Sequence, residues 1–591
     1  MMGRRSEWAT GVQDPQGSGR QRDGSSDDPA GALIDARRRL LGSTGAFLPA
    51  RVPRLNGLPD PFAPLAAVTM ELAEHYHKPA AGVRRWIDSL FGEADPALEE
   101  AVLGADEATK AGLFAVLAVL AHLYRWDTVP PDPARFDETD LRLPAPIRGP
   151  LHALCDEVGV PRVGTMWSFV MCNWVIPGRE GDAYDPGTLP DQDVRLACRW
   201  LRPPFDVSLE NFHLAFVLLE AKGGPVIAHA VDAVAAVLRG DHLALTGALT
   251  ALTEAIEGMS HQFVDRVRST RVTLDGWLDL IQPTFGWGLR DTDGQVVAGP
   301  GGMQLGVIHV LDAVLGVPAG STVGTATVAS RRYIPNPQRQ FLTLLDAVAP
   351  QVRRSVVTDG HPALKRAFND AVRAFRRFRV SHRVQGARYL RVGRHTGTPR
   401  VSSGIVAWRE DPSQPETEPA EQFERQMLDR IMETTDALAP GAGEPYELRA
   451  PDVSFRFLDR RQLRELLGMA RRRSYPAGSV IIAAGERSPA MYLLTEGTAL
   501  VVTEWPLGRP VATLWPGELF GELSFLGSVP TRNVVADTDV VVDVLHGDSV
   551  HTMLDADAGL AAAFYRSLAV LVAHRLNTDS SAAGWVMATG R

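Results

Sequence analysis

Along the first two thirds of the chain, apolar residues recur at the three- and four-residue intervals of amphipathic helices. The longest segments of this kind are 105–124 and 243–267, and shorter ones lie at 34–41, 68–76 and 147–158. Residues 1–30 break the pattern, because they are rich in Gly, Ser, Asp and Arg and offer little to bury. The pattern therefore predicts a disordered start followed by an all-α region.

The pattern changes near residue 455 to short runs of β-branched residues separated by glycines. These runs predict strands at 480–482, 491–494, 499–502 and 540–545, with turns at Gly478, Gly485, Gly497, Gly517 and Gly521. Short, evenly spaced strands are typical of a jelly roll. The predicted fold class is multidomain, with an all-α region followed by a mainly-β jelly roll and flanking helices.

Polar and Pro-rich segments at 396–399 and 411–419 lie between these two regions and are typical of a linker. A single helical pattern at 421–438 follows them. The organisation that we expect is a tail at 1–30, a small helical lobe at 31–195, a large helical lobe at 196–395, a linker with one helix at 396–450, the jelly-roll domain at 451–580 and a tail at 581–591.

Composition and charge narrow the setting of the protein. The formal net charge of -9 argues against a nucleic-acid-binding surface over the whole chain. Cys155, Cys172 and Cys198 have no metal-ligand spacing and form no disulfide framework. The N-terminus lacks the apolar core of a signal peptide, and no apolar run reaches the length of a membrane span. We expect a cytoplasmic chain with neither nucleic acid nor membrane as a partner.

The most informative stretch of the helical region is 373–390. Phe375, Phe378, His382 and Tyr389 recur there at helical spacing, between arginine-rich flanks. A neutral imidazole on such an inward face suits the proximal position of a haem iron, and nearby arginines suit the haem propionates. The plainer alternative is a core histidine whose ring nitrogens find partners within the protein.

Two motifs add to this interpretation. Residues 332–342 read Arg-Tyr-x-Pro-x-x-x-Arg-x-Phe-Leu, and residues 382–389 read His-x-x-Gln-x-x-x-Tyr. A glycine-rich loop at 299–302 precedes both. In this order the series resembles the C-terminal signatures of the indoleamine 2,3-dioxygenase family of haem enzymes. The resemblance is continuous over roughly 196–390 and fainter over 35–195.

The resemblance implies that haem b is the cofactor and that His382 is its metal ligand. It implies charge pairing of Arg379 and Arg339 with the propionates or the proximal side, for which a solvated salt bridge is the alternative. It also implies that Phe212 and Gly301 face the substrate, although an ordinary flexible loop explains the glycines equally well.

The same resemblance implies a distal position, near the substrate, for the apolar segment 165–174. Met166, Phe169 and Val170 are its expected contributors. A buried core helix is the alternative explanation of this segment.

Besides Gly301, which stands where a serine is expected, the chain departs from the family pattern at two positions. Phe216 stands where a small hydroxyl residue is expected, which crowds the distal pocket and removes a hydrogen-bond donor. Ile281 or Gln282 stands where an arginine is expected to pair with the substrate carboxylate. Because a carboxylate in a dry pocket needs a charge partner or strong donors, the sequence favours a neutral indole or another aromatic over free tryptophan. His213 is expected on a helix surface.

A separate motif lies in the jelly roll. Phe520 begins a Phe-Gly-Glu-Leu sequence, and Arg532 follows ten residues after the Glu. A short helix opening at Gly521 directs backbone N–H groups at an anion, while an arginine can fork onto a phosphate and a carboxylate can accept from a ribose hydroxyl. The motif resembles the phosphate-binding cassette of cyclic nucleotide-binding domains, which implies cAMP or cGMP as ligand and the following site residues: Gly521, Glu522, Leu523, Arg532 and Asn533.

The alternative for the cassette is a domain that has lost its ligand, since Asn533 replaces the small residue usual after the arginine. A helix predicted at 560–576 is the last element, so no helix-turn-helix DNA reader is expected. That helix makes a homodimer conceivable.

Together these observations favour a haem-dependent dioxygenase that acts on an indole or related aromatic with O₂ and carries a cyclic-nucleotide-binding regulatory domain. A non-catalytic haem or nucleotide sensor or scaffold is the alternative, and the two family departures favour it. A related haem enzyme with a different reaction on an aromatic substrate is a third possibility.

Overall fold

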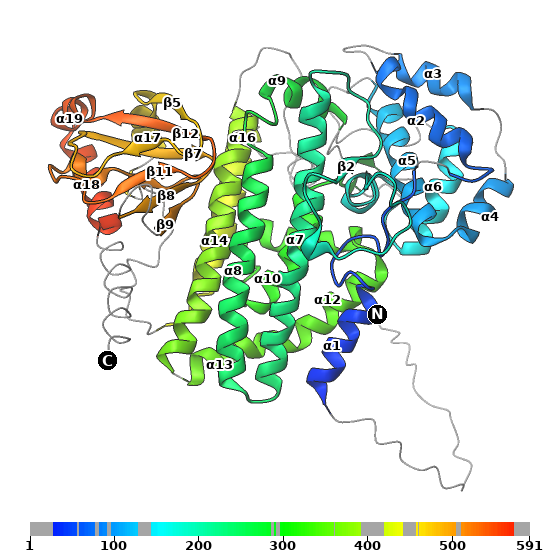
Figure 1. Ribbon diagram of the computed structural model, residues 1–591, viewed down its shortest axis with the longest axis horizontal. Helices are drawn as coiled ribbons and strands as arrows, with labels where there is room; N and C mark the ends of the chain where they lie inside the picture. The colour runs from blue at the N-terminus through cyan, green and yellow to red at the C-terminus, as the bar shows by residue number, and fades with distance from the viewer. Residues whose placement is uncertain are drawn as a thin grey trace, which may run out of the picture.

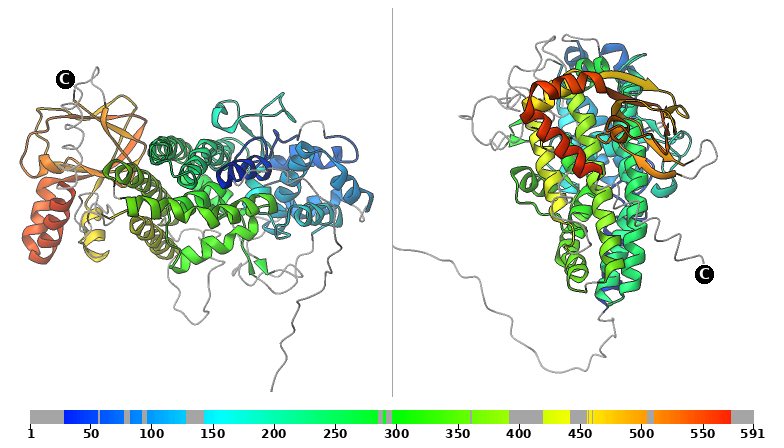
Figure 2. Two further views of the ribbon diagram at one scale, coloured as in Figure 1. Left: turned by 90° about the horizontal axis from the view of Figure 1, so that it is seen from below. Right: turned by 90° about the vertical axis from the view of Figure 1, so that its left-hand side faces the viewer.

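The computed structural model describes residues 28–55, 58–76, 82–91, 96–127, 143–284, 289–290, 296–359, 361–391, 419–440, 455, 457–458, 460–503 and 510–572. A helical body makes up most of the molecule, and a β-roll with its own helices lies at one end of it (Figures 1 and 2). The predicted fold class is confirmed. Residues 1–27 of the predicted disordered start and the predicted tail at 581–591 fall outside the described residues, and α1 already begins at Pro29.

Three long helices form the centre of the helical body: α7 (Asp206–Leu238), α8 (His242–Arg266) and α14 (Pro362–Arg391) (Figure 1). The side chain of Asp241 begins α8 by accepting a hydrogen bond from the N–H of Ala244 at 2.9 Å. The shorter helices α10 (Gly306–Val314), α11 (Thr322–Ala329), α12 (Asn336–Val348) and α13 (Pro350–Asp359) complete this lobe.

The small lobe consists of α2 (Ala63–His75), α3 (Val83–Leu90), α4 (Pro96–Gly104), α5 (Glu107–Arg125) and α6 (Ala145–Val158). Helix α5 is buried on all sides. Two short hairpins, β1 (Trp174–Val175) with β2 (Arg195–Leu196) and β3 (Leu289–Arg290) with β4 (Val296–Val297), belong to the connections. Helix α1 (Pro29–Leu40) packs against α7 and α12. Our expectation that the small lobe begins at residue 31 therefore needs correction, because α1 covers the large lobe.

Helices α5 and α7 are long and apolar enough to cross a membrane by length and composition alone. The apolar windows of these two helices are 89% and 78% buried inside the protein, respectively. Burial of this extent is that of core helices in a globular body.

Helix α16 (Pro419–Asp436) runs along α14 in Figure 1. The backbone carbonyl of Arg430 accepts a hydrogen bond from Arg379 at 3.2 Å, and the carbonyl of Ala439 accepts one from Asn369 at 3.2 Å. We expected this helix in a linker at 396–450. The structure instead makes it part of the large lobe, because its buried polar groups are bound to α14.

The β-roll has two four-stranded sheets, ordered β10-β7-β12-β5 and β6-β11-β8-β9. Their strands are β5 (Arg471–Tyr475), β6 (Val480–Ile482), β7 (Ala490–Glu496), β8 (Ala499–Val502), β9 (Pro510–Leu514), β10 (Leu519–Phe520), β11 (Asn533–Ala536) and β12 (Val540–His546). All pairings are antiparallel. The glycines predicted as turns between strands all have positive φ: Gly478, Gly485, Gly497, Gly517 and Gly521.

Four helices flank the roll: α17 (Arg460–Gly468), α18 (Glu522–Phe525), α19 (Gly547–Ala556) and a last one at Ala558–Val572. The ring of Phe564, from the last helix, stacks on Phe455 at 5.8 Å and meets Phe525 edge-on at 5.6 Å. These contacts form a second core that holds the cassette helix α18 against the end of the chain.

Candidate functional site

His382 lies in the second half of α14, among aromatic rings from three helices. Its ring is stacked with Phe378 of α14 at 6.3 Å and meets Phe263 of α8 and Phe423 of α16 edge-on at 6.0 and 5.9 Å. No described residue forms a hydrogen bond with either of its ring nitrogens. The alternative of a core histidine held by protein partners is therefore not what the structure shows.

Burial in this aromatic surround and, to a lesser extent, the positive charge of Arg379 lower the pKa of His382 to about 4. The imidazole is consequently neutral near pH 7. A neutral ring with a nitrogen lone pair is the form that ligates a metal.

The two other residues of the His-x-x-Gln-x-x-x-Tyr motif hold α14 against the end of α8. The Gln385 amide donates to the carbonyl of Val264 at 3.4 Å. The hydroxyl of Tyr389 donates to the carbonyls of Val267 and Val272 at 3.0 and 2.9 Å. The motif thus combines one candidate ligand with two residues that fix the orientation of its helix.

Arg379 binds protein acceptors on every side. Its guanidinium donates to Asp312 at 2.5 Å, to the carbonyl of Arg430 and to the hydroxyl of Thr434. Asp312 in turn accepts from Arg430 at 2.5 Å, and Arg430 pairs with Glu433. All four charged side chains of this network are nearly buried.

Arg339 is likewise committed, to the backbone carbonyls of Gly159, Arg332 and Ile334 at 3.0–3.2 Å. The alternative of a solvated salt bridge therefore holds for neither Arg379 nor Arg339. Propionate pairing by these two arginines stays a prediction that the structure does not favour, because their donors already have partners.

Arg383 is a residue that the sequence reasoning missed. Its Nε is buried and has no hydrogen-bond partner among the described residues, and burial lowers its pKa. The side chain as a whole is only partly buried, and a ligand anion beside it would stabilise its charge. Its position next to His382 makes it the better candidate for an acidic group of a cofactor.

The distal candidates form a row of rings that leads to His382. Phe212 meets Phe216 at 5.2 Å, Phe216 meets Phe263 at 5.7 Å, and Phe263 meets His382. Trp277, in the π-helical turn η4 (Trp277–Ile281), lies 4.3 Å from Phe212. Phe216 therefore extends the aromatic wall where a small hydroxyl residue was expected, and it supplies no donor.

The segment expected on the distal side is a π-helical turn, η2 (Met166–Met171), and not a regular core helix. π-helical turns are frequent at functional sites. Met166, Phe169 and Val170 are all buried.

Gln304 joins η2 to the glycine loop. Its Oε1 accepts from the N–H of Met166 at 2.8 Å, and its Nε2 donates to the carbonyl of Gly299 at 2.8 Å. The loop is held further by the Tyr333 hydroxyl, which accepts from the N–H of Ala298 at 2.7 Å. A Cβ added at Gly302 would meet no atom within 4 Å. The loop, with Gly301 in it, is thus anchored at both ends and open at its tip.

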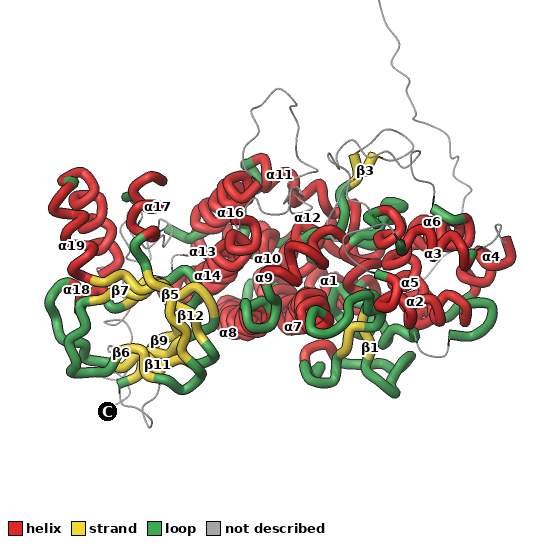
Figure 3. Tube along the Cα trace, turned by 90° about the horizontal axis from the view of Figure 1, so that it is seen from above, coloured by secondary structure: helices red, strands yellow, loops and turns green. Residues whose placement is uncertain are grey.

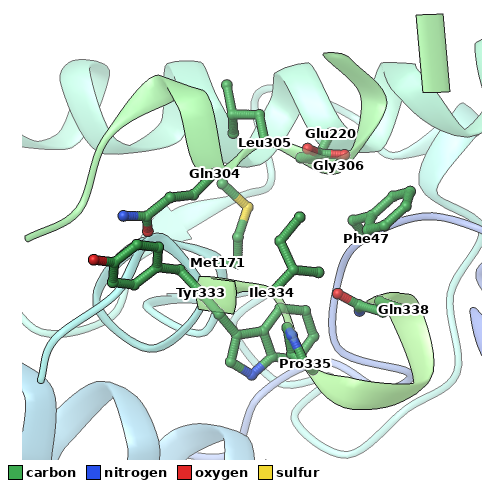
Figure 4. A pocket seen from close by; sticks show the side chains of 11 residues that line it. Phe47, Met171, Glu220, Gln304, Leu305, Gly306, Tyr333, Ile334, Pro335 and Gln338 are labelled. Carbon is green, nitrogen blue, oxygen red and sulfur yellow. The ribbon is translucent and has the colours of Figure 1, made fainter. Parts of the chain in front are cut away.

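Gln304 and Tyr333 also line a small cavity together with Glu220 and Gln338 (Figure 4). Its volume of about 10 Å³ is room for a single water. Glu220 accepts from the N–H of Val307 at 3.2 Å, and burial raises its pKa to about 8. This carboxyl is therefore protonated at neutral pH and holds the start of α10.

His213 was expected on a helix surface, but the structure shows it fully buried. Its Nδ1 bonds the carbonyl of Leu209 at 3.0 Å, and its ring lies 5.5 Å from Phe169. The ring of Phe169 is also stacked with a second buried histidine, His122, at 4.2 Å. Burial lowers the pKa of both histidines to about 4, so both are neutral.

The positions considered for substrate carboxylate binding are buried and uncharged. Ile281 and Gln282 are 0% and 1% exposed, respectively. Since neither side chain can neutralise a carboxylate, the expectation of an uncharged substrate is unchanged by the fold.

The cassette of the β-roll connects β10 to β11, which belong to different sheets. Gly521, at φ 83°, begins α18, where no side chain caps the first N–H groups. Glu522 is buried, and Leu523 is exposed. Arg532 directly precedes β11.

The side chain of Asn533 binds the protein backbone. Its Oδ1 accepts from the N–H of Ala484 at 2.9 Å and so fixes the turn after β6. The substitution of the usual small residue therefore has a structural explanation, and it does not by itself indicate loss of the ligand.

A sequence model of the indoleamine 2,3-dioxygenase family matches residues 41–422. The chain belongs to this family. A model of the cyclic nucleotide-binding domain matches residues 472–557, within the β-roll. The indoleamine 2,3-dioxygenase match extends into α16, in agreement with the packing of that helix on α14.

Among similar proteins, human indoleamine 2,3-dioxygenase 2 is 26% identical over 289 residues, which are 46% of this chain and 66% of the human protein. The indoleamine 2,3-dioxygenase qulI of Penicillium citrinum is 24% identical over 382 residues, which are 60% of this chain and 79% of that protein. For the β-roll, the cAMP-dependent protein kinase regulatory subunit of Aspergillus niger is 42% identical over 81 residues, 14% of this chain and 20% of the subunit. The chain thus spans just under two thirds of the human relative.

The residues present fit the haem that the indoleamine 2,3-dioxygenase family implies. His382 offers a neutral imidazole that no protein group occupies, in a surround of aromatic rings. Arg383 offers a partly buried cation that no described anion neutralises. This donor set is that of a histidine-ligated haem with one charge partner on the same helix.

Proposed function

We propose that this protein binds haem through His382 and inserts O₂ into an uncharged indole or a related aromatic. The observation that carries the proposal is the neutral imidazole of His382, which lies against Phe263, Phe378 and Phe423 and has no hydrogen-bond partner among the described residues. Bound haem would supply the activation of O₂, and the protein would orient the reactants and exclude water.

The protein's part is orientation and exclusion of water. Gln385 and Tyr389 fix the helix of His382, and Arg383 is available to an acidic group of the cofactor. Phe212 and Trp277 provide flat apolar faces on which an aromatic substrate can stack. The glycine loop, held by Gln304 and Tyr333, leaves backbone space near Gly301.

We also propose that the β-roll binds a cyclic nucleotide through the backbone at Gly521 to Leu523 and through Arg532. Its support is the position of Gly521 at the start of α18, the buried Glu522, and the match to the cyclic nucleotide-binding domain.

The test is oxygen-dependent turnover by the haem-loaded protein under reducing conditions, with indole and tryptophan as separate substrates. We expect indole to be consumed at least ten-fold more efficiently than tryptophan, because no cation stands at 281 or 282. Gln282→Arg and Gln282→Lys, which both introduce a cation, should shift that ratio toward tryptophan. Gln282→Met is the matched uncharged control and should leave the ratio unchanged. Preference of the unaltered protein for tryptophan would contradict the proposal for the substrate.

A non-catalytic haem sensor is the second candidate, and Phe216 is the observation that favours it. Its ring extends the aromatic wall between Phe212 and Phe263, where the family places a small hydroxyl residue. Haem binding without turnover of indole, in both the unaltered chain and Phe216→Ser, would establish this candidate in place of the enzyme.

A further inference from the structure

The β-roll is docked on the helix that carries His382. The tight turn before β10 lies against α14: the hydroxyl of Ser381 donates to the carbonyl of Pro516 at 3.3 Å. A Cβ at Gly517 would come within 2.7 Å of Val380 and 3.1 Å of Val384. The views from the side and from above both place the roll beside α8 and α14 (Figures 1 and 3).

The roll contacts the face of α14 that lies opposite to the face carrying His382. Successive helix positions turn by about 100°, so Val380 and Val384 lie on one side and His382 on the other. The helix therefore separates two sites: its one face meets aromatic rings, and its other face meets the nucleotide-binding domain.

A second contact joins the roll to the end of α8. The carboxylate of Glu496, 3% exposed at the end of β7, accepts from both the N–H and the hydroxyl of Ser269, at 2.7 and 2.5 Å. His261 pairs with Asp537 at 3.4 Å nearby. This end of α8 is the one that Gln385 and Tyr389 bind from α14, so both contacts converge on the same part of the large lobe.

The docking turn is continuous with the phosphate cassette. Gly517 donates to the carbonyl of Leu494 at 2.7 Å, and β10 then pairs with β7 at Leu519 and Phe520. Gly521 follows directly, so only three residues lie between Gly517 of the turn and Gly521 of the cassette. Because the connecting segment is so short, a shift of the cassette backbone should be transmitted to the turn that contacts Val380.

Open space also lies next to the contact between the roll and the helical body. A cavity of about 290 Å³ lies beside it, lined by Arg268 and Thr270 of the helical body and by Tyr475, Glu496 and Asp539 of the roll. A densely packed interface would resist small displacements, whereas this interface has open space beside the Glu496–Ser269 contact.

We propose that the turn Trp515–Gly517 and the Glu496–Ser269 contact couple nucleotide occupancy of the cassette to α14 at His382. The inference rests on the proposed function and adds the route and its residues. Coupling between two binding sites is reciprocal, so loading of haem at His382 should change the affinity of the cassette for nucleotide by the same factor by which nucleotide changes the affinity for haem.

The experiment measures the dissociation constant of cAMP by calorimetry on the full chain, first without haem and then loaded with ferric haem. We expect the two constants to differ by roughly five-fold or more, the lower range of typical couplings. Ser381→Ala and Glu496→Gln should each reduce this ratio toward one, while both ligands still bind.

Matched controls lie next to the coupling residues. Thr495→Ala removes a hydroxyl from the same strand as Glu496, but its bond to the carbonyl of Val541 lies within the roll. Ser260→Ala removes a buried hydroxyl from α8 that binds only its own helix at Ile256. Both controls should keep the ratio of the unaltered chain.

The outcomes separate the two proposals. Equal cAMP constants with and without haem, in a chain that binds both, would overturn the coupling and leave the proposed function standing. An unchanged ratio in Ser381→Ala and Glu496→Gln would overturn the assigned route. Failure to bind haem or cAMP at all would overturn the proposed function and the coupling together.

Discussion

At the scale of single residues, burial decides the charge state of the candidate site. His382, His122 and His213 are neutral because their surroundings are apolar and their pKa values lie near 4. Glu220 is neutral for the same reason, with a pKa near 8. A distal and proximal environment of low polarity suits an uncharged aromatic substrate better than an amino acid.

Glu220 allows a test of this burial. The folded protein holds its proton up to about pH 8, whereas the unfolded chain loses it above the ordinary value of 4.5. The contribution of Glu220 to stability is therefore full below pH 4.5 and is lost as pH rises toward 8, by on the order of 4 kcal/mol. Glu220→Gln should remove this loss, so its melting temperature relative to the unaltered protein should rise between pH 5 and pH 8. The exposed Glu254→Gln is the control, and an equal pH profile for all three proteins would contradict the assignment.

At the scale of elements, α14 is held on two sides, by α16 through charges and by α8 through Tyr389. The charged network supplies protein partners for the guanidinium of Arg379, so its pairing with a propionate stays a prediction that these contacts do not favour. Asp312 is its centre, since it accepts from both Arg379 and Arg430.

Removal of the Asp312 charge should leave the buried Arg379 without its acidic partner, whereas Arg430 keeps its pair with Glu433. We expect Asp312→Asn to lower the free energy of unfolding by about 3 to 5 kcal/mol. Asp346→Asn is the matched control, because its pair with Arg331 is partly exposed and should contribute under about 1 kcal/mol. Denaturant unfolding measures both, and equal effects of the two variants would argue against a buried network.

The Tyr389 hydroxyl gives a second prediction at this scale. Tyr389→Phe leaves the carbonyls of Val267 and Val272 without this donor, so we expect a loss of about 1 to 3 kcal/mol. The effect should be accompanied by faster amide hydrogen exchange at the end of α8. Unchanged exchange there would show that Gln385 and packing hold the two helices without the hydroxyl.

Helix and strand periodicity predicted most elements, and the glycine turns of the roll were confirmed at positive φ. The sequence did not reveal what depends on distant contacts. Phe423 reaches His382 from a helix that follows a long polar segment, so local pattern assigned it to a linker. Phe263 and Gln304 carry ordinary core and loop signals, and only the fold brings them to His382 and Met166. Arg379 and Arg383 are indistinguishable in the motif, because their difference is whether an acidic partner from another helix is present.

At the scale of the whole molecule, the helical body and the β-roll meet at one helix, α14. Cyclic nucleotide should stabilise the chain by mass action, by about 2.7 kcal/mol at a concentration of one hundred times its dissociation constant. We expect the first unfolding transition to rise with cAMP in the unaltered chain and not in Arg532→Ala. Arg566→Ala, which removes an arginine over the ring of Phe457 elsewhere in the roll, is the control that should still respond. A rise in Arg532→Ala equal to that of the control would exclude Arg532 as a phosphate ligand.

The central claim is that His382 would hold the iron of a bound haem. The most direct measurement is the optical spectrum of the haem-reconstituted chain in the ferric, ferrous and ferrous carbon monoxide states, beside His382→Ala and the exposed-histidine control His361→Ala. We expect stoichiometric haem, a Soret band that shifts on reduction and again with carbon monoxide, and loss or alteration of these bands in His382→Ala alone. An unaltered chain that takes up no stoichiometric haem, or a His382→Ala variant with unchanged spectra, would contradict the account.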